Sequence, residues 1–267
     1  MRAAKRRTRK GILLKSRAEL VKMRRAGAIV AEVLGRLGEA TTPGTTTAEL
    51  DQLAEDTIRG HGATPSFLGQ RVENRRYPAS TCISVNDEVV HGIPRPERRV
   101  QAGDIVSVDV GACWDGYHAD AAVTVAVGKV SADAARLLDV TRESLELALA
   151  EVAPGRWLAD IARAIQEHVE AAGFSVVRAL SGHGIGASLW EAPQVHNFVT
   201  EGRGVRLRAG MTLAIEPMVN AGQPEVRPSE DMWTMRTVDG SLSGHFEHTV
   251  AITKAGAEVL TAGGDNG

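Results

Sequence analysis

A segment that ends in a carboxylate occurs twice in this chain, and this repeat constrains the fold more than any other feature. One copy runs Ala102-Gly-Asp-Ile-Val-Ser-Val-Asp109, and the other runs Ala209-Gly-Met-Thr-Leu-Ala-Ile-Glu216. The tripeptide His-Gly-Ile also occurs twice, at His91 and at His183. A strand that ends in an acid, present once in each half, predicts a duplicated fold. Its pseudo-symmetric halves would point carboxylates at one central site.

The order of the predicted elements also restarts halfway along the chain. Capping boxes at Ser16–Glu19 and Thr46–Glu49 begin the first two helices. The predicted elements are helices over 17–38 and 46–59, a loop over 62–78, a hairpin of strands 82–85 and 88–90, a strand pair at 105–110 and 121–127, helices over 131–152 and 158–172, and strands at 175–180, 211–215 and 249–252. Helices followed by strands favour an α+β fold over an alternating parallel sheet. No low-complexity linker interrupts the pattern, so we expect a single domain over residues 16–262.

The composition is that of an ordinary globular protein. The chain has 267 residues, of which 43% are hydrophobic and 24% charged, with a net charge of −2. These values exclude wholesale disorder and give no general argument for nucleic acid or membrane binding. The two cysteines, Cys82 and Cys113, do not make a disulfide framework. No apolar run reaches the roughly 20 residues of a spanning helix. We therefore expect a cytoplasmic protein without membrane contact.

The first fifteen residues differ from the rest in charge. Six basic residues fall within the first ten positions, and the first acid is Glu19. They are Arg2, Lys5, Arg6, Arg7, Arg9 and Lys10. One interpretation is a tail that makes weak contact with nucleic acid, for example at a ribosome. The other is a flexible, solvated terminus.

Four acids and one histidine are the candidate metal ligands: Asp109, Asp120, His183, Glu216 and Glu247. Asp115-Gly116 can turn one strand back, so that Asp109 and Asp120 point the same way. Four carboxylates at one place repel one another unless cations neutralise them. Two divalent ions would do so, and oxygen ligands with one imidazole suit Mn, Fe, Co or Zn. Any one of these acids alone is more often a surface or capping residue, so the prediction depends on the joint pattern.

Several segments, which occur in the expected order along the chain, carry a resemblance to the type I methionine aminopeptidases over about residues 17–260. The segments are Tyr77-Pro-Ala-Ser-Thr-Cys-Ile-Ser-Val85, His91-Gly-Ile-Pro94, Asp109-Val-Gly, Asp115-Gly-Tyr-His-Ala-Asp120, Gly182-His-Gly-Ile-Gly186, Glu191-Ala-Pro-Gln-Val195, Ile215-Glu-Pro-Met-Val-Asn-Ala-Gly222 and Glu247-His-Thr249. The resemblance implies the pita-bread fold, in which an antiparallel sheet curves around two metal ions and helices pack outside. It also implies a monomer that acts on the N-terminus of a peptide or nascent protein.

The resemblance also implies a role for each matching residue. Asp109 would chelate one metal, Asp120 and Glu247 would bridge both, and His183 and Glu216 would complete the ligand shell of the other metal. A hydroxide held between the metals would attack the first peptide carbonyl, with Glu216 as the catalytic acid and base. His91 would hydrogen-bond the substrate near the scissile amide. The substrate pocket would be lined by Tyr77, Cys82, Trp190 and Trp233.

Two departures from the family pattern fall on the substrate side. Trp190 stands where the family carries a second histidine, seven residues after His183. Tryptophan donates one hydrogen bond but accepts none and carries no charge. The segment Phe67–Tyr77 is longer than usual and adds Arg71, Arg75 and Arg76. It is either a tolerated surface insertion or a change in the pocket for the first residue.

The remaining histidines receive structural interpretations. His118 is either a hydrogen-bond partner of Asp120 or a packing residue. His61, His168, His196 and His245 we assign to the surface or to structural roles.

Three hypotheses follow for the function. The first is a dinuclear-metal aminopeptidase that removes N-terminal methionine. The second keeps the metals but acts on another first residue or a small amide, through Trp190 and the longer loop. The third is a non-catalytic binding module on the same fold. Metal content separates the third hypothesis from the others, and a peptide panel separates the first from the second.

Overall fold

The computed structural model describes residues 6–8, 11–72 and 74–263. The predicted nucleic-acid contact of the basic tail therefore falls largely outside the described residues. The helices are α1 (Arg17–Ala40), α2 (Thr47–Gly60), α3 (Ala132–Ala150) and α4 (Leu158–Ala171). All of them lie close to their predicted positions. None of the helices in the described part of the chain has the length and apolarity needed to cross a membrane.

Both predicted capping boxes are present. The Ser16 hydroxyl accepts from the Glu19 N–H at the start of α1, and the Glu19 carboxylate accepts from the Ser16 N–H. Thr46 and Glu49 make the same exchange at the start of α2. Each box satisfies N–H groups that have no partner inside the helix, so the two helices begin where the sequence indicated.

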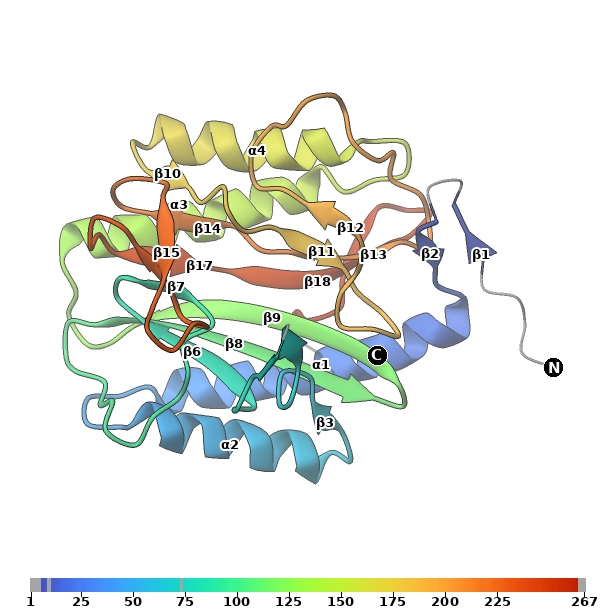
Figure 1. Cartoon of the computed structure of the whole chain (residues 1–267). Helices are drawn as coiled ribbons and strands as arrows, with labels where there is room; N and C mark the ends of the chain where they lie inside the picture. Colours follow the sequence, from blue (N-terminus) through green and yellow to red (C-terminus); the bar gives the residue numbers. More distant parts are fainter. Residues whose placement is uncertain (1–5, 9–10, 73, 264–267) are drawn as a thin grey trace.

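A curved antiparallel sheet forms the centre of the molecule (Figure 1). Its strands, in spatial order, are β12 (Glu191–Val195), β11 (Gly182–Gly184), β13 (Thr212–Ile215), β18 (Glu247–Ile252), β9 (Tyr117–Ala126), β8 (Ile105–Trp114) and β3 (Thr64–Pro65), with β19 (Ala257–Val259) paired to β18 and β6 (Thr81–Val85) paired to β8. The pairs are antiparallel. The fold is α+β, as predicted.

Smaller sheets flank the central one. They are β10 (Ser175–Val176) with β14 (Met218–Asn220) and β17 (Ser243–His245); β15 (Val226–Pro228) with β16 (Met235–Thr237) and β7 (Glu88–Val90); β1 (Arg6–Arg7) with β2 (Leu13–Leu14); and β4 (Arg71–Val72) with β5 (Arg75–Arg76). These strands are short and were mostly not predicted.

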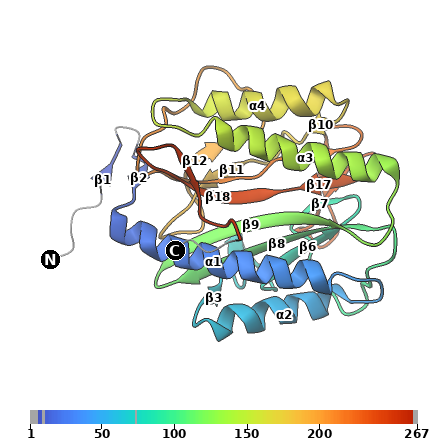
Figure 2. The same ribbon diagram turned by 180° about the vertical axis from the view of Figure 1, so that it is seen from behind.

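The helices cover one side of the curved sheet. Viewed from behind, α1 and α3 lie in front of the strands, with α2 and α4 outside them (Figure 2). Helix α1 packs over β8 and β9, α2 packs against α1, β3 and β6, and a cluster of buried residues that includes Ile29, Leu37 and Val108 fills the space between. A second cluster, including Leu137, Ile161 and Ile215, lies under α3 and α4. Each half therefore has a core of its own, and the opposite side of the sheet is left for a site.

The two halves repeat in backbone detail. Gly103 and Gly210 both adopt left-handed φ angles, 97° and 94°. Their N–H groups donate to Val127 O and Ile252 O, in each case over 2.8 Å. These glycines begin the two copies of the repeated segment, where only glycine enters this conformation without strain. The duplication predicted from the sequence is therefore visible in the strand register.

Some predicted elements differ from those observed. Asn86 does turn the chain, with φ 62°, but β6 and β7 do not form the expected hairpin. Instead β6 pairs with β8, and β7 pairs with β16. The predicted loop over 62–78 contains β3, β4 and β5, and the strand expected over 175–180 is only β10. The turn chemistry was right, but tertiary pairing decided the partners.

The segment just before α1 packs against the domain. Ile12 is buried in the core beneath α3 and α4. Lys15 Nζ lies 2.5 Å from Glu191 Oε2, and both side chains are almost fully buried. The Lys15 N–H also donates to Gly210 O over 2.7 Å. Residues 11–15, which the sequence analysis placed in the tail, are thus in contact with the beginning of β12.

Candidate metal centre

The five candidate ligands come from five strands or strand ends that meet on the open side of the sheet. Asp109 lies within β8, Asp120 within β9, His183 within β11, Glu216 directly after β13, and Glu247 at the start of β18. All five line one cavity of about 540 Å³.

The strand register explains why the carboxylates converge. Asp109 pairs with Ala122, and Asp120 pairs with Gly111 two positions along. Because side chains alternate across a strand, both acids lie on the same face of the sheet. In the second half Ile215 pairs with His248, so Glu216 and Glu247 are the next residues along the two strands. The register thus directs one acidic pair from each half toward the same place.

The ligand atoms are close enough to share metal ions. His183 Nε2 lies 3.5 Å from Asp120 Oδ2 and 3.7 Å from Glu216 Oε1. One ligand atom each from Asp120, His183 and Glu247 lie within 4.8 Å of one another. The other ring nitrogen of His183, Nδ1, is 2.9 Å from Gly184 O. A proton on Nδ1 satisfies that carbonyl and leaves Nε2 as the metal-binding atom.

Because these acids are buried close together, ionising them in the absence of cations is energetically costly. Asp120 and Glu247 are each only 3% exposed. Loss of solvation raises the pKa of Asp109 and of Glu247 well above the usual range, and the neighbouring Asp120 charge raises both further. The pKa of Glu216 is likewise raised by burial and by Asp120. Asp109 Oδ1 has no hydrogen-bond partner among the described residues. Four oxygen donors and one imidazole nitrogen therefore fit divalent metal ions.

Thr249 supports the centre from β18. Its Oγ1 accepts from the Asp120 N–H over 3.0 Å and lies 2.7 Å from Asp120 O and 3.0 Å from Asp120 Oδ1. These contacts hold the Asp120 carboxylate in one orientation, as outer partners of metal ligands generally do. His118, which the sequence suggested for this role, instead contacts Ser66 Oγ over 2.9 Å through Nδ1.

All the predicted substrate residues line the same cavity as the candidate ligands: Tyr77, Cys82, His91, Trp190 and Trp233. Cys82 pairs directly with Asp109 across β6 and β8, so it lies at the cavity floor. Burial raises the pKa of its thiol well above the usual value, and the nearby Asp109 adds to this effect. The Tyr77 hydroxyl lies 3.0 Å from both Thr81 O and Gly92 O. The neutral, buried thiol of Cys82 and the hydrogen-bonded hydroxyl of Tyr77 are suited to lining a substrate pocket.

His91 is held in a strained backbone conformation. Its φ is 60°, a left-handed value uncommon for residues other than glycine. Gly92 follows it, and a Cβ there would come within 2.2 Å of Ile83 O. Burial lowers the pKa of His91 to about 4. The imidazole is therefore neutral at physiological pH and can donate one hydrogen bond and accept another.

Trp190 stands on the cavity wall rather than in the core. It is 50% exposed, whereas the preceding Leu189 is 3% exposed and packs inside. Gln70 and Val72, from the loop that the sequence marked as longer than usual, also line the cavity. Trp190 and the segment that contains Gln70 and Val72 therefore meet at the cavity in space, although they lie far apart in the chain.

His245 lies next to one of the candidate ligands, a position that the sequence analysis did not predict. We assigned it to the surface or to a structural role, but its side chain is only 2% exposed and its Nε2 lies 4.0 Å from Glu216 Oε2. Met218 pairs with His245, just as Gly111 pairs with Asp120 in the first half. His245 thus occupies the position in the second half that Asp120 occupies in the first. The repeat offset, extended to the partner strand, was the signal that pointed to it.

Comparison with known proteins defines the class. The model of metallopeptidase family M24 matches residues 21–254, and this chain belongs to that family. It is a metallo-aminopeptidase by class.

Individual relatives are more specific. The chain is 50% identical over 250 residues to a methionine aminopeptidase of Clostridium perfringens, covering 94% of this chain and 98% of the relative. It is 49% identical over 250 residues to methionine aminopeptidase 1 of Bacillus subtilis, covering 94% and 99%.

Solved structures show the same fold. The crystal structure of methionine aminopeptidase from Thermotoga maritima superposes with a TM-score of 0.90 at 47% identity, over 94% of this chain and 99% of that one. Prolidase from Pyrococcus furiosus matches with a TM-score of 0.76 at 22% identity, over 94% and 66%, and shares the fold alone. The pita-bread fold predicted from the sequence is confirmed.

Proposed function

We propose that this protein is a dinuclear-metal aminopeptidase that removes N-terminal methionine from peptides and nascent proteins. The observation that carries the proposal is one cavity whose floor and wall differ in chemistry. Its floor holds four converging carboxylates and one imidazole, and its wall is lined mainly by apolar and aromatic side chains. The relatives named methionine aminopeptidases match over nearly the whole chain and support the same activity.

In this proposal the five candidate ligands hold two divalent ions. Asp109 would hold one ion, His183 and Glu216 would hold the other, and Asp120 and Glu247 would contribute to both. When bound, the ions supply Lewis-acid polarisation of the first peptide carbonyl and lower the pKa of a water molecule. Four negative charges and a buried location support two ions rather than one, because a single divalent ion leaves two charges uncompensated.

Restriction to the first residue follows from the free amino group of the substrate. An unprotonated α-amino group would offer its lone pair to a metal ion held by these ligands, whereas an acylated amino group would not. The cavity volume of about 540 Å³ accommodates only a short part of a peptide. The chain therefore selects an end rather than an internal bond.

Glu216 and His91 are the residues that we propose handle protons and orient the amide. The Glu216 carboxylate lies at the cavity surface, with a side chain 14% exposed, and burial and Asp120 raise its pKa. It can take a proton from the attacking water and pass it to the leaving amine. The neutral imidazole of His91 hydrogen-bonds the substrate beside the scissile bond.

Methionine suits the rest of the cavity wall. Phe67, Tyr77, Cys82 and Trp233 supply apolar and aromatic surface near the floor. An unbranched thioether side chain adapts to such a surface and makes favourable contacts with aromatic rings.

A second candidate function, cleavage of a different first residue or of a small amide, is favoured by one observation. Trp190 is half exposed on the cavity wall and cannot accept a hydrogen bond or carry a charge. A site reshaped by Trp190 and by Gln70 and Val72 from the longer loop keeps the metals but changes the residue that fits.

Metal stoichiometry and product analysis together test the proposal. The purified protein, loaded with Mn²⁺ or Co²⁺, is expected to hold two ions per chain by elemental analysis. It should release free methionine from Met-Ala-Ser and leave the N-acetylated peptide intact. A protein that holds no metal and releases no amino acid would instead favour the third hypothesis, a binding module.

A further inference from the structure

The turn that carries Trp233 has an unfavourable backbone conformation. We call residues Asp231, Met232 and Trp233 the rim turn, because Trp233 lines the cavity. Met232 has a φ of 62°, although it is not glycine, and its side chain is 53% exposed. The Met232 side chain is too exposed to hold this conformation by packing. Other contacts must therefore hold the rim turn in place.

Asp231 provides the first set of these contacts. Its Oδ1 accepts from the Trp233 N–H over 2.9 Å and from the Thr234 N–H over 2.8 Å. Its Oδ2 accepts from Thr234 Oγ1 over 2.8 Å and from Arg95 Nη2 over 2.9 Å. Arg95 lies just beyond the segment that contains His91, so this ion pair ties the two cavity-lining segments together.

Arg75 provides the second set from a different direction. It belongs to β5 of the β4–β5 hairpin, in the loop that the sequence marked as longer than usual. Its Nη1 donates to Met232 O over 2.5 Å, and its guanidinium lies 5.6 Å from the centre of the Trp233 ring. Because Val72 pairs with Arg75 and lines the cavity, this hairpin places Arg75 between the cavity edge and the rim turn.

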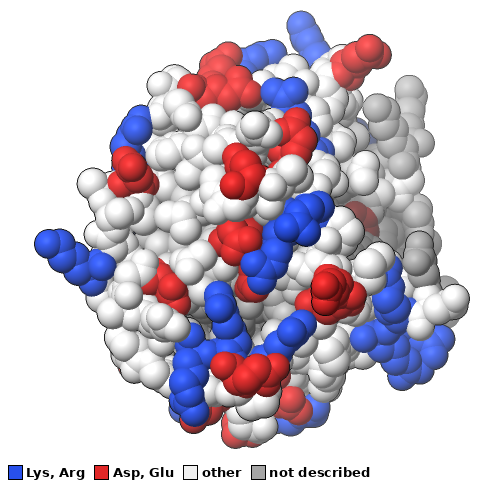
Figure 3. Space-filling view, turned by 60° about the vertical axis from the view of Figure 1, so that its left-hand side comes forward, with Lys and Arg blue, Asp and Glu red and all other residues white. Residues whose placement is uncertain are grey.

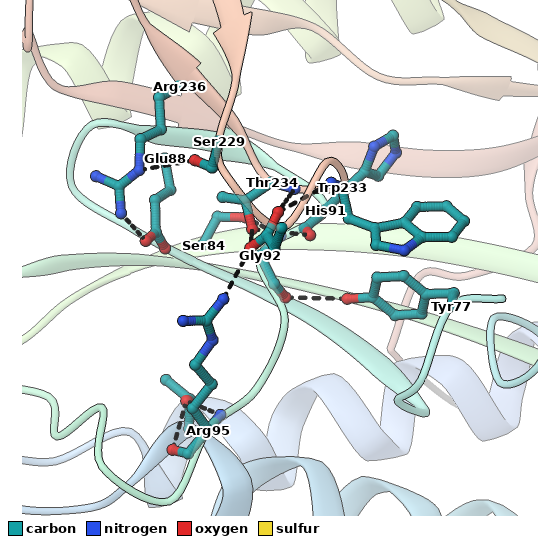
Figure 4. A network of polar contacts seen from close by, with 12 residues as sticks. Tyr77, Ser84, Glu88, His91, Gly92, Arg95, Ser229, Trp233, Thr234 and Arg236 are labelled. Carbon is teal, nitrogen blue, oxygen red and sulfur yellow. Dashed lines mark hydrogen bonds and ion pairs between the residues drawn. The ribbon is translucent and has the colours of Figure 1, made fainter. Parts of the chain in front are cut away.

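Trp233 is thereby fixed against the cavity wall. Its ring packs edge-on against Tyr77 with a centroid separation of 5.3 Å. Figure 4 shows the Trp233 and Tyr77 rings side by side, with Arg95 reaching up from below and Thr234 close to His91. Thr234 Oγ1 lies 3.5 Å from His91 O. The rim turn therefore contacts the pocket wall through Trp233, and the adjoining Thr234 contacts the strained His91.

Several charges around this region are arranged in pairs. The face turned to the viewer in Figure 3 mixes basic and acidic side chains instead of presenting one sign. Arg236, for example, pairs with Asp87 and Glu88. This favours a role for Arg75 and Arg95 in fixing local structure over a role in binding a large polyanion.

We propose that Arg75 and Arg95 are positioning residues that hold the rim turn from two sides and so set how the cavity selects the first residue of the peptide. The inference rests on the proposed function and deepens it. It assigns a purpose to the β4–β5 hairpin, which supplies Arg75. Neither arginine lines the cavity, so both act through Trp233.

The test replaces each arginine by methionine, which keeps the apolar stem and removes the guanidinium. Arg75→Met, Arg95→Met and the double variant are compared with Arg142→Met, which removes a matched exposed ion pair on α3. Because exposed ion pairs and cation–π contacts each contribute only about a factor of five, KM for Met-Ala-Ser should rise roughly tenfold or more in the double variant. The kcat value and the metal content should change by less than about twofold, because the ligands are untouched.

A spectroscopic signal follows the rim turn independently of activity. The four tryptophans are labelled with 5-fluorotryptophan, and Trp233→Phe assigns the Trp233 resonance in the ¹⁹F NMR spectrum. That resonance should shift and broaden in the double variant and stay unchanged in Arg142→Met. If the wild-type protein releases no methionine, the proposed function fails, but this signal still tests the positioning role.

Met232→Gly supplies a rescue. Glycine enters the left-handed region without the penalty that Met232 incurs, so the rim turn needs less support. Adding Met232→Gly to the double variant should recover part of the KM and move the Trp233 resonance back toward its wild-type position. An unchanged Trp233 resonance in the double variant, or no recovery with glycine, would overturn the proposal.

Discussion

The floor and the rim of the cavity are built in opposite ways. The floor residues, such as Asp120 and Glu247, lie on regularly paired strands and are almost entirely buried. The rim residues, such as Trp190 and Met232, lie on turns or at strand ends and are half exposed. The floor is held by strand register and two hydrophobic cores, and the rim by single side-chain contacts.

The floor residues therefore serve the chemistry of the site, and the rim residues determine which peptide is selected. Changing a floor residue disturbs a group of coupled charges and therefore the metal site itself. A change in the rim alters the shape of the cavity mouth but leaves the ligands alone. Substitutions in the floor should abolish every activity, and those in the rim should alter which peptide is cleaved and how tightly it binds.

The largest effect is expected from removing a floor carboxylate. Asp109→Asn should reduce metal loading and lower kcat/KM for any peptide by about 10³-fold or more, because the Lewis-acid contribution is lost. Elemental analysis and steady-state kinetics measure both. Asp115→Asn is the matched control, because Asp115 lies at the turn between the same two strands and is exposed. Full activity in Asp109→Asn would contradict the assignment of Asp109 as a metal ligand.

Removing the metal should destabilise the protein, and the size of this destabilisation should depend on pH. Chelation at pH 7.5 should lower the melting temperature by about 10 °C, as expected for loss of two ions that are each at a hundredfold excess over Kd. Burial raises the pKa of Asp109, Glu216 and Glu247, so the metal-free folded state binds more protons than the unfolded state above pH 4.

The sign of this effect follows directly. A raised carboxyl pKa contributes stability below the unfolded pKa, and that stability is lost as the pH rises through the folded pKa. Metal-free protein should therefore gain stability from pH 8 to pH 5 as far as these acids are concerned. The stabilisation by added Mn²⁺ should shrink over the same range, because protons compete for the ligands. Thermal melts with and without chelator give both trends, and a metal effect that grows on acidification would contradict them.

A smaller effect is expected at the rim. Trp190→His should raise kcat/KM for methionine release by roughly ten- to a hundredfold if the tryptophan weakens an otherwise intact site, since a histidine there can hydrogen-bond the developing charge. Metal content should not change. Trp157→His, in a tryptophan outside the cavity, is the control. A loss of activity toward the peptide actually cleaved would mean that Trp190 serves a different substrate.

The smallest effect concerns the charge of His91. Burial lowers its pKa to about 4, so the unfolded state binds more protons than the folded state from about pH 6.5 downward. Stability from this residue is therefore present above pH 6.5 and is lost as the pH falls toward 4. Denaturant melts should show a shallower acid loss for His91→Asn than for the wild type. A His91 ring that titrates near pH 6.5 by NMR would contradict this picture.

The sequence predicted the five candidate ligands that the structure brings together at the floor, but not the contacts that form the rim. The repeated segment, the two capping boxes and the Asp115-Gly116 turn each follow local rules, and these rules place Asp109 and Asp120 on one face. The position of His245 was not predicted because the repeat offset was not extended to the strand that pairs with Met218. The hairpin expected around Asn86 failed because β7 pairs with a distant strand. Contacts of single side chains, such as Arg95 with Asp231, have no periodic signal in the sequence.

The most direct test of the central claim is product release from a panel of short peptides by the Mn²⁺-loaded protein. The panel varies the first residue of X-Ala-Ser and includes N-acetylated and metal-free controls. The account predicts cleavage of free-amino Met-Ala-Ser above all others, only the first residue released, and no turnover of the acetylated peptide. Silence toward methionine with both metals bound, or cleavage at an internal bond, would contradict it.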